Sequence, residues 1–243
     1  MIRIFSDLHL EFGIDIVKKC KNFCELKKVK YTILAGDITN FTNKSQDLSY
    51  LISEIRPYTD HIIYVLGNHE YYESKKSKIN DVRDSYKSIC NDLNITLLEN
   101  EYLETDDFIF YGATMWTDIT KIAFDRMNDK YSFESINELL DIHKESKSKL
   151  EEFVNEYKSK KPLVVITHHL PSFSLIDKEY EKYKDTNSGF ASELDYLIKN
   201  PISYWIYGHT HMPNNSTINN VKLFCNPAGY PGKERINFKD HTF

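Results

Sequence analysis

Cysteine is scarce in this chain, and the four that occur do not form a metal-binding or disulfide framework. No Cys-x-x-Cys pair occurs, so a Cys–zinc site is not expected. Cys20 and Cys24 lie one helical turn apart, which fits a pair of buried thiols. Few, scattered cysteines are typical of a protein from a reducing compartment.

Long apolar runs and an excess of basic residues are also missing. No stretch reaches the roughly 18 apolar residues of a membrane span, and the N-terminal residues do not resemble a signal peptide. Lysine and arginine number 31 against 36 aspartate and glutamate residues, giving a formal net charge of −5. Stable binding to nucleic acid needs clustered cations, so it is not expected. We expect a cytoplasmic protein, and nothing in the sequence indicates an obligate protein partner.

The composition is that of a folded protein with strands and helices. Of the 243 residues, 41% are hydrophobic and 28% are charged, which is too apolar for a disordered chain. No linker, repeat or composition shift divides the chain, so we expect one domain over residues 1–243. Short β-branched and aromatic runs predict strands at Ile2–Phe5, Tyr31–Ala35, Ile62–Leu66, Phe108–Ala113, Leu163–Thr167, Tyr204–Tyr207, Val221–Cys225 and Arg235–Phe238.

Longer amphipathic stretches lie between these runs. The spacing of apolar residues predicts helices over 15–28, 46–56, 75–92, 134–160 and 190–199, and the Asn219–Asn220 pair predicts a hairpin turn. This order predicts a mixed sheet, or a pair of sheets, covered by helices. The polar stretch 172–189 has no clear period. We interpret it either as a solvated loop or as a mobile flap over a site.

Polar side chains follow five of the predicted strands at the point where each strand ends. Taken singly, an aspartate there often caps a helix, and a lone histidine is usually just hydrogen-bonded. Five such clusters in succession are poorly explained as five coincidences. Ligands of open α/β sheets bind at the carboxyl ends of strands, so we expect a site formed by Asp7, His9, Asp37, Asn68, His69, His168, His209 and His211.

The donor atoms of this set fit a pair of divalent metal ions. A dinuclear site needs a carboxylate that bridges both ions, with imidazole and oxygen ligands on each, and Asp37 is the natural bridge. The set mixes imidazole, carboxylate and amide groups without a thiolate. This mixture favours Mn, Fe, Zn or Co, among which we favour Mn, over Cu(I) or an iron–sulfur cluster.

The same residues, in the same order, resemble the motifs of the calcineurin-like metallophosphoesterases. The series is Asp-x-His, Gly-Asp, Gly-Asn-His-Glu, His and Gly-His-x-His between Asp7 and His211, and stretches such as GATMWTD, THHLPS and CNPAGYP look like a compact branch of this family. The resemblance covers nearly the whole chain. It implies an α/β fold, a four-layer α-β-β-α sandwich of two mixed sheets flanked by helices.

The resemblance also implies a role for each residue of the series. The first metal would be held by Asp7, His9, Asp37 and His211, and the second by Asp37, Asn68, His168 and His209. A hydroxide bridging the metals would attack phosphorus, and His69 would protonate the leaving oxygen as general acid. His169 would point toward the substrate or pack against its neighbours.

Two departures from the protein Ser/Thr phosphatases of this family narrow the expected substrate. Those enzymes carry an acidic residue that orients the catalytic histidine, and an arginine before Gly-Asn-His-Glu. Asn40 and Leu66 stand at these positions here, so a carboxylate–histidine pair from that segment is not expected. We predict a phosphatase or phosphodiesterase acting on a small phosphorylated molecule or nucleotide.

Alternatives to this function stay open. A nuclease or a cyclic-nucleotide phosphodiesterase would use the same metals, and a non-catalytic scaffold would keep only the fold. Trp116 and the Asn128–Asp129 pair match the pattern of the compact branch and would either line the cleft or pack. We interpret Asn226–Tyr230 as a structural turn after a strand.

Overall fold

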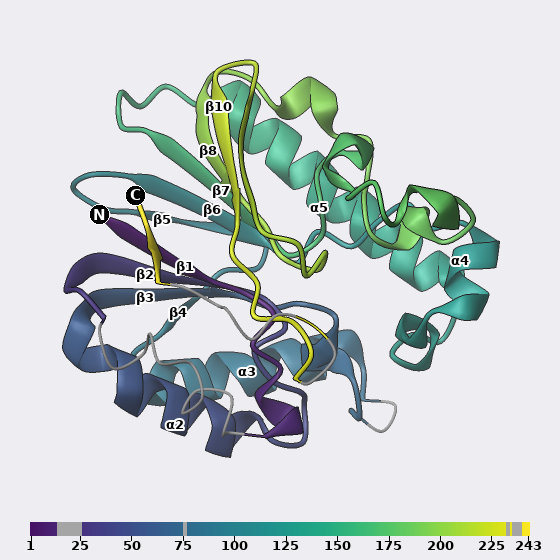
Figure 1. Cartoon of the computed structure of the whole chain (residues 1–243), viewed down its shortest axis with the longest axis horizontal. Helices are drawn as coiled ribbons and strands as arrows, with labels where there is room; N and C mark the ends of the chain where they lie inside the picture. The colour runs from purple at the N-terminus through teal and green to yellow at the C-terminus, as the bar shows by residue number, and fades with distance from the viewer. Residues whose placement is uncertain (14–25, 75–76, 232–233, 235–239) are drawn as a thin grey trace.

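Two β-sheets packed face to face form the centre of the computed structural model, which describes residues 1–13, 26–74, 77–231, 234 and 240–243 (Figure 1). In this part of the chain the first sheet has the strand order β11-β1-β2-β3-β4, and its strands are β1 Ile2–Phe5, β2 Val29–Ala35, β3 Thr59–Val65, β4 Thr96–Leu97 and β11 His241–Thr242. The second has the order β5-β6-β7-β8-β10-β9, and its strands are β5 Glu101–Glu104, β6 Ile109–Ala113, β7 Leu163–Thr167, β8 Ile202–Ile206, β9 Asn214–Ile218 and β10 Val221–Cys225.

Both sheets are mixed. Strands β1 to β4 pair in parallel and β11 joins β1 antiparallel. In the second sheet, β6, β7, β8 and β10 pair in parallel, while β5 and β9 are antiparallel edge strands. Parallel neighbours have their carboxyl ends at the same edge, so the loops that follow β1, β2, β3, β7 and β8 can meet.

Helices cover the outer face of each sheet, as Figure 1 shows. Helices α2 (Lys44–Ile55) and α3 (Ile79–Asp92) lie on the first sheet, and α4 (Lys121–Arg126) and α5 (Ile136–Glu156) lie on the side of the second. The described helices include none long and apolar enough to cross a bilayer. The four layers confirm the α-β-β-α sandwich that the resemblance implied.

Alternation along the strands creates three apolar layers. In β7, Val164 and Ile166 face the first sheet, where they join Ile33 and Val65 in the core between the sheets. The opposite side of the same strand contributes Val165 to the core under α5. The outer face of the first sheet packs on α2 and α3 through Leu34, Tyr64, Leu48, Leu51, Val82 and Tyr86.

Most of the predicted elements occur with small shifts of their ends, and the hairpin turn is confirmed by Asn219 and Asn220, which both have positive φ between β9 and β10. The helix predicted over 190–199 is wrong, because the structure has only a 3₁₀ turn there, Asp195–Leu197. Its backbone forms hydrogen bonds to a neighbouring segment instead of within a helix. The Leu194 amide donates to the Pro171 carbonyl, and the Leu170 amide donates to the Phe190 carbonyl.

Several elements were missed because their sequences lack a clear apolar pattern. Edge strand β9 is polar throughout most of its length, and β4 and β11 have two residues each. The expected strand at 235–238 and most of the helix expected over 15–28, with Cys20 and Cys24, lie outside the described residues. Cys90 and Cys225 are buried free thiols.

Candidate metal centre

The loops that follow five parallel strands bring the predicted ligands together at one edge of the two sheets. Asp7 and His9 follow β1, Asp37 follows β2, His168 follows β7 and the remaining residues follow β3 and β8. The predicted metal ligands form two groups, each with ligand atoms within 4.8 Å of one another: Asp7, His9, Asp37 and His211, and Asp37, His168 and His209. Asp37 belongs to both groups, as a bridging carboxylate would. A third group of the same closeness joins His9 to Glu11 and His69.

The first group stands on the loops that follow β1, β2 and β8. Nε2 of His9 lies 3.0 Å from Nε2 of His211, and Nε2 of His211 lies 3.5 Å from Oδ1 of Asp7. Oδ2 of Asp37 lies 3.9 Å from Nε2 of His9. The outer nitrogen of His211 contacts the Glu234 carboxylate, which keeps Nε2 turned inward.

The second group is completed by the amide of Asn68. Nδ1 of His168 donates to the Ala35 carbonyl at 2.9 Å, so its lone pair is on Nε2. That nitrogen lies 3.0 Å from Oδ1 of Asn68, 3.2 Å from Nδ1 of His209 and 3.3 Å from Oδ1 of Asp37. The Asn68 amide nitrogen donates outward to Asp129 at 3.0 Å, which points its carbonyl oxygen into the site.

Backbone strain is concentrated at this edge. Five of the predicted ligands have φ between 48° and 66°, in the left-handed region that residues other than glycine rarely adopt: Asp7, His9, Asp37, His209 and His211. Such conformations persist only where the surrounding structure enforces them, and they cluster at functional sites. The turns present the side chains to a common space at the expense of local stability.

Glycine allows the loops to approach one another closely. A Cβ on Gly36, where φ is +83°, would lie 2.2 Å from Nδ1 of His168, and one on Gly67 would lie 2.3 Å from Oδ1 of Asp37. The glycines of Gly-Asp and Gly-Asn-His-Glu are therefore both required by packing, and Gly36 is required by turn geometry as well.

Glu70 holds two of the loops together from beneath. Its buried carboxylate accepts the backbone N–H groups of Asp37, Ile38, Thr39 and Gly67 and the hydroxyl of Tyr64. These donors come from the loops after β2 and β3, so Glu70 fixes the position of Asp37 relative to Asn68. The last residue of Gly-Asn-His-Glu is thus a positioning group.

The residues present fit a pair of cations. Oδ2 of Asp7 and Nε2 of His209 are buried without a hydrogen-bond partner, which is costly unless another group satisfies them. Imidazole nitrogens also face each other across both groups, and a cation between them would relieve that repulsion. The donor set contains nitrogen and oxygen, which suits divalent transition ions and leaves their identity open.

Charge in the site is balanced between the carboxylates and the imidazoles. Burial opposes ionisation of Asp37, but His168, His69 and His9 outweigh it and hold its pKa well below the ordinary value. Burial likewise opposes protonation of His168, yet Asp37 raises its pKa to about 9. Burial lowers the pKa of His209 well below the usual range. Binding of cations would compete with these protons.

His69 lies beside the two groups and is held at both ring nitrogens. Nδ1 lies 2.8 Å from Oε1 of Glu11, and Nε2 lies 3.1 Å from the Tyr230 hydroxyl. Its backbone N–H donates to Asp37 at 2.8 Å. Burial opposes its protonation, but Asp37 and Glu11 raise the pKa of the imidazole to about 9.

Glu11, Tyr230 and Glu234 are site residues that the sequence reasoning missed. Glu11 supplies the carboxylate that Asn40 does not, and it also accepts from Nδ1 of His9 at 3.1 Å. Tyr230, expected in a structural turn, packs its ring against His9 at 4.4 Å between centroids, with the two rings tilted by 31°. The position of Glu11 two residues after His9 is the only signal that could have been used.

The remaining candidates divide between packing and lining. Nδ1 of His169 lies 3.2 Å from the Thr114 carbonyl oxygen, and burial together with His168 lowers the pKa of the His169 imidazole to about 3. Of the two roles expected for His169, its contacts fit packing against its neighbours. Trp116 is also buried and packs on Tyr71. Asn128 lines the cavity beside the site, whereas its neighbour Asp129 is buried and orients Asn68.

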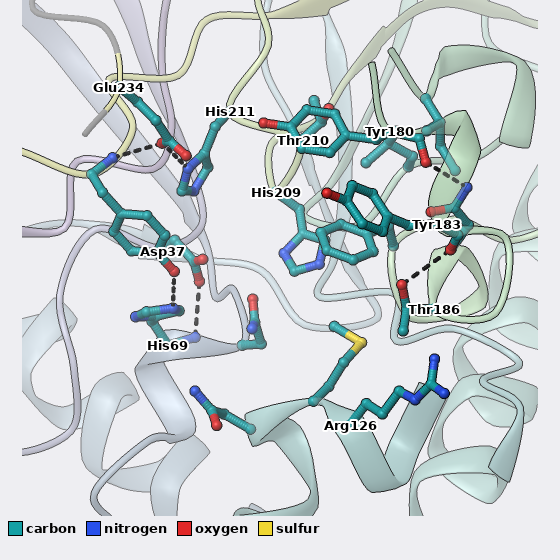
Figure 2. Close-up of a pocket in the computed structure, with 18 of the residues that line it drawn as sticks. Asp37, His69, Arg126, Tyr180, Tyr183, Thr186, His209, Thr210, His211 and Glu234 are labelled. Atoms are coloured by element: carbon teal, nitrogen blue, oxygen red, sulfur yellow. Dashed lines mark hydrogen bonds and ion pairs between the residues drawn. The ribbon is translucent and has the colours of Figure 1, made fainter. Parts of the chain in front are cut away.

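A cavity of about 530 Å³ opens from both groups. Asp37, Asn68, His209 and His211 line one side of it, together with His69. The opposite side is formed by the segment 172–190 and the end of α4 (Figure 2). The interpretation of 172–189 as an element over the site therefore agrees with its position.

Residues 1–213 match the model of the calcineurin-like phosphoesterase family. With the two mixed sheets and the cluster of metal-binding side chains, this match shows that the chain belongs to the calcineurin-like phosphoesterases.

Among curated proteins, the chain is similar to the uncharacterized protein L509 of Acanthamoeba polyphaga mimivirus, with 32% identity over 272 aligned positions that cover 100% of this chain and 95% of that protein.

Solved structures of the same fold include phosphatases and a hydrolase. The phosphopantetheinyl hydrolase PptH of Mycobacterium tuberculosis superposes with a TM-score of 0.73 at 16% identity, covering 99% of this chain and 95% of that one. A dimetal phosphatase from Danio rerio superposes with a TM-score of 0.53 at 11% identity, covering 92% and 86%. At these identities the superpositions describe the fold alone.

Proposed function

We propose that this protein is a dinuclear metal-dependent phosphoesterase that hydrolyses a phosphomonoester or a phosphodiester of a small molecule. The observation that carries the proposal is the convergence of two ligand groups on the shared carboxylate of Asp37. Two divalent ions, with Mn favoured, would supply Lewis acidity and a water of lowered pKa when bound. Asp7, His9, Asp37 and His211 would hold one ion, and Asp37, Asn68, His168 and His209 the other.

His69 is the proton donor in this proposal. Glu11 accepts from Nδ1, so the other nitrogen carries the proton that can move, and it faces the cavity beside Tyr230. The carboxylate also favours the imidazolium form, which is the form that can protonate a leaving oxygen. In the hydrolysis, a water oxygen bonds to phosphorus and gives up a proton to solvent, the P–O bond to the leaving oxygen breaks, and that oxygen takes the proton from Nε2.

Tyr230 and Glu234 act as positioning groups. The Glu234 carboxylate accepts from the Tyr230 backbone N–H at 2.9 Å and contacts Nδ1 of His211. This joins a ligand of the first group to the residue that bonds His69. Burial raises the pKa of the Tyr230 phenol, which keeps it protonated.

A complete ligand set argues against a non-catalytic scaffold, because scaffolds of such folds lose ligands. A cavity of small-molecule size and a net charge of −5 argue against a nuclease for long nucleic acids. A cyclic-nucleotide phosphodiesterase stays open. From the sequence we further propose one domain over 1–243 and a cytoplasmic location, in keeping with the buried free thiols.

Turnover of two chromogenic esters tests the proposal directly. Protein loaded with Mn²⁺ is expected to hydrolyse p-nitrophenyl phosphate, its bis ester, or both, and to bind two metal ions per chain by elemental analysis. Hydrolysis of the bis ester alone assigns a diesterase. No turnover with any of Mn, Fe, Zn and Co, together with no bound metal, contradicts the proposal and favours the scaffold.

Replacement of His69 tests the role of the proton donor. We expect His69→Asn to keep both metals and to slow hydrolysis by about 10²–10⁴-fold for poor leaving groups, and far less for p-nitrophenol, which leaves without protonation. Glu11→Gln should show the same leaving-group dependence with a smaller loss. Equal losses for good and poor leaving groups would contradict the general-acid assignment.

A further inference from the structure

The cavity beside the candidate metal centre determines which organic group the site accepts. Asp37, Asn68 and His209 line it, so a phosphoryl group at the metals would have its organic part inside the cavity. Its volume of about 530 Å³ is that of a small-molecule site. The inference below rests on the proposed function and concerns the chemical class of this organic part.

Aromatic rings are concentrated in the wall of the cavity. They account for five of the nineteen described lining residues, against 14% of the chain: Tyr72, Tyr180, Tyr183, Phe190 and Tyr230. The Phe190 ring lies 4.7 Å from the His209 ring between centroids, so the aromatic surface begins at a candidate ligand. Tyr183 is 53% exposed. Aromatic side chains that line a cavity favour a flat, unsaturated ligand.

The segment that carries three of these rings is fixed by short-range bonds. The amides of Tyr183, Thr186 and Gly189 donate to carbonyls three residues earlier. The segment is also anchored to the start of α4, where the Thr120 amide donates to Oγ of Ser188 at 3.1 Å. Figure 2 shows Tyr180 and Tyr183 on this segment, in the part of the cavity next to His209.

Positive charge in the cavity is limited to one side chain apart from the histidines. Arg126 is the only lysine or arginine among the described lining residues. Its partner Asp185 lies 3.5 Å away and both side chains are more than half exposed, so the pair is weak. A single cation suits one small anionic or hydrogen-bonding ligand, whereas a nucleic-acid strand needs a row of cations.

We propose that the cavity binds the nucleoside part of a mononucleotide phosphoester, either a monoester or a cyclic diester. The base stacks on the Tyr180 and Tyr183 rings, and Arg126 donates to acceptor atoms on its edge. Water supplies an oxygen to phosphorus, the P–O bond to the sugar breaks, and the sugar oxygen takes a proton from His69. Ring-free phosphoesters lack the stacking contribution.

Substrate competition provides the first test. Protein loaded with Mn²⁺ is assayed with adenosine 5′-monophosphate, 3′,5′-cyclic adenosine monophosphate, β-glycerophosphate and 4′-phosphopantetheine, of which the last two carry no ring system. We expect kcat/KM for at least one nucleotide to exceed both ring-free esters by about tenfold or more. Hydrolysis without this preference overturns the inference and leaves the proposed function intact. If none of the four is hydrolysed while p-nitrophenyl phosphate or its bis ester is, the inference is overturned and the proposed function stands.

Replacement of a tyrosine provides the second test. Tyr183→Ala should lower the ratio of kcat/KM for the nucleotide to that for β-glycerophosphate by about tenfold, and Tyr183→Phe should retain it. Tyr102→Ala is the matched control, because Tyr102 is 57% exposed on edge strand β5. Equilibrium titration with adenosine 5′-monophosphate supplies a readout without turnover, with Kd raised by the same factor. An unchanged ratio and Kd in Tyr183→Ala overturn the inference.

Discussion

The two sides of the cavity are built in different ways. On the metal side, side chains such as Asp7, His9 and His168 are completely buried, and several stand on left-handed backbone. On the opposite side, segment 172–189 is exposed or half-buried over nearly all of its length and contains three short 3₁₀ turns among its described residues. Metal ligands must be held at fixed distances and angles for catalysis, whereas a binding surface needs only suitable side chains within reach of the ligand. Strain and buried hydrogen bonds are therefore found on the metal side.

Removal of one carboxylate from each side of the cavity should give the largest difference in metal content and activity. Asp37→Asn weakens the ligand shared by both groups, so we expect fewer than one metal ion per chain and a loss of activity of at least about a thousandfold, more than a single electrostatic donor contributes. Asp185→Asn, on the exposed side, should keep both metals. Elemental analysis and initial rates measure the two effects. Two metals retained in Asp37→Asn would contradict the bridging role.

Two glycines allow the same comparison for stability. In Gly36→Ala the new methyl would lie 2.2 Å from a buried imidazole at positive φ, so we expect a loss of about 2–4 kcal/mol. In Gly189→Ala the methyl would lie 2.0 Å from Sδ of Met127, a flexible side chain that can move, so the loss should stay near 1 kcal/mol. Urea unfolding of the metal-free variants measures both values. Equal losses would remove the proposed difference in rigidity.

Amide hydrogen exchange should separate the two sides without mutation. The amides of Asp37, Ile38 and Thr39 donate to the buried Glu70 carboxylate, so their exchange requires a larger opening. Amides in 172–189 bond nearby carbonyls at the surface. We expect the first set to exchange at least about a hundredfold more slowly. Comparable rates would show that the aromatic wall is as rigid as the metal side.

Acid sensitivity of the scaffold is the smallest expected effect. His143 on α5 is buried and Nδ1 contacts the Trp116 carbonyl, and burial lowers the pKa of this imidazole. Because the unfolded chain takes up the proton more readily, His143 contributes stability above its ordinary pKa that is lost as pH falls below it. Tm should therefore fall less from pH 8 to pH 5.5 in His143→Asn than in wild type. His61→Asn, at an exposed histidine, is the control and should follow wild type.

Local sequence patterns determined most of the fold and the ligand set. Short apolar runs rich in β-branched residues specify strands such as Leu163–Thr167, and the glycine and histidine clusters stand directly after them, so the order of the candidate ligands could be predicted. The four-layer arrangement followed from the family resemblance rather than from periodicity. The polar edge strand Asn214–Ile218 gave no such signal, because its stability comes from pairing with β10.

Only the tertiary structure decided how His69 is held and what the cavity offers a substrate. Glu11 is 58 residues from His69 in the sequence, and Tyr230 is 161 residues away, so neither contact leaves a local pattern. Asn40 showed that the loop after β2 supplies no carboxylate to His69. It could not show that Glu11, in the loop after β1, supplies one. Periodicity reports on the faces of individual elements, whereas contacts between distant loops depend on the path of the chain around the sheets.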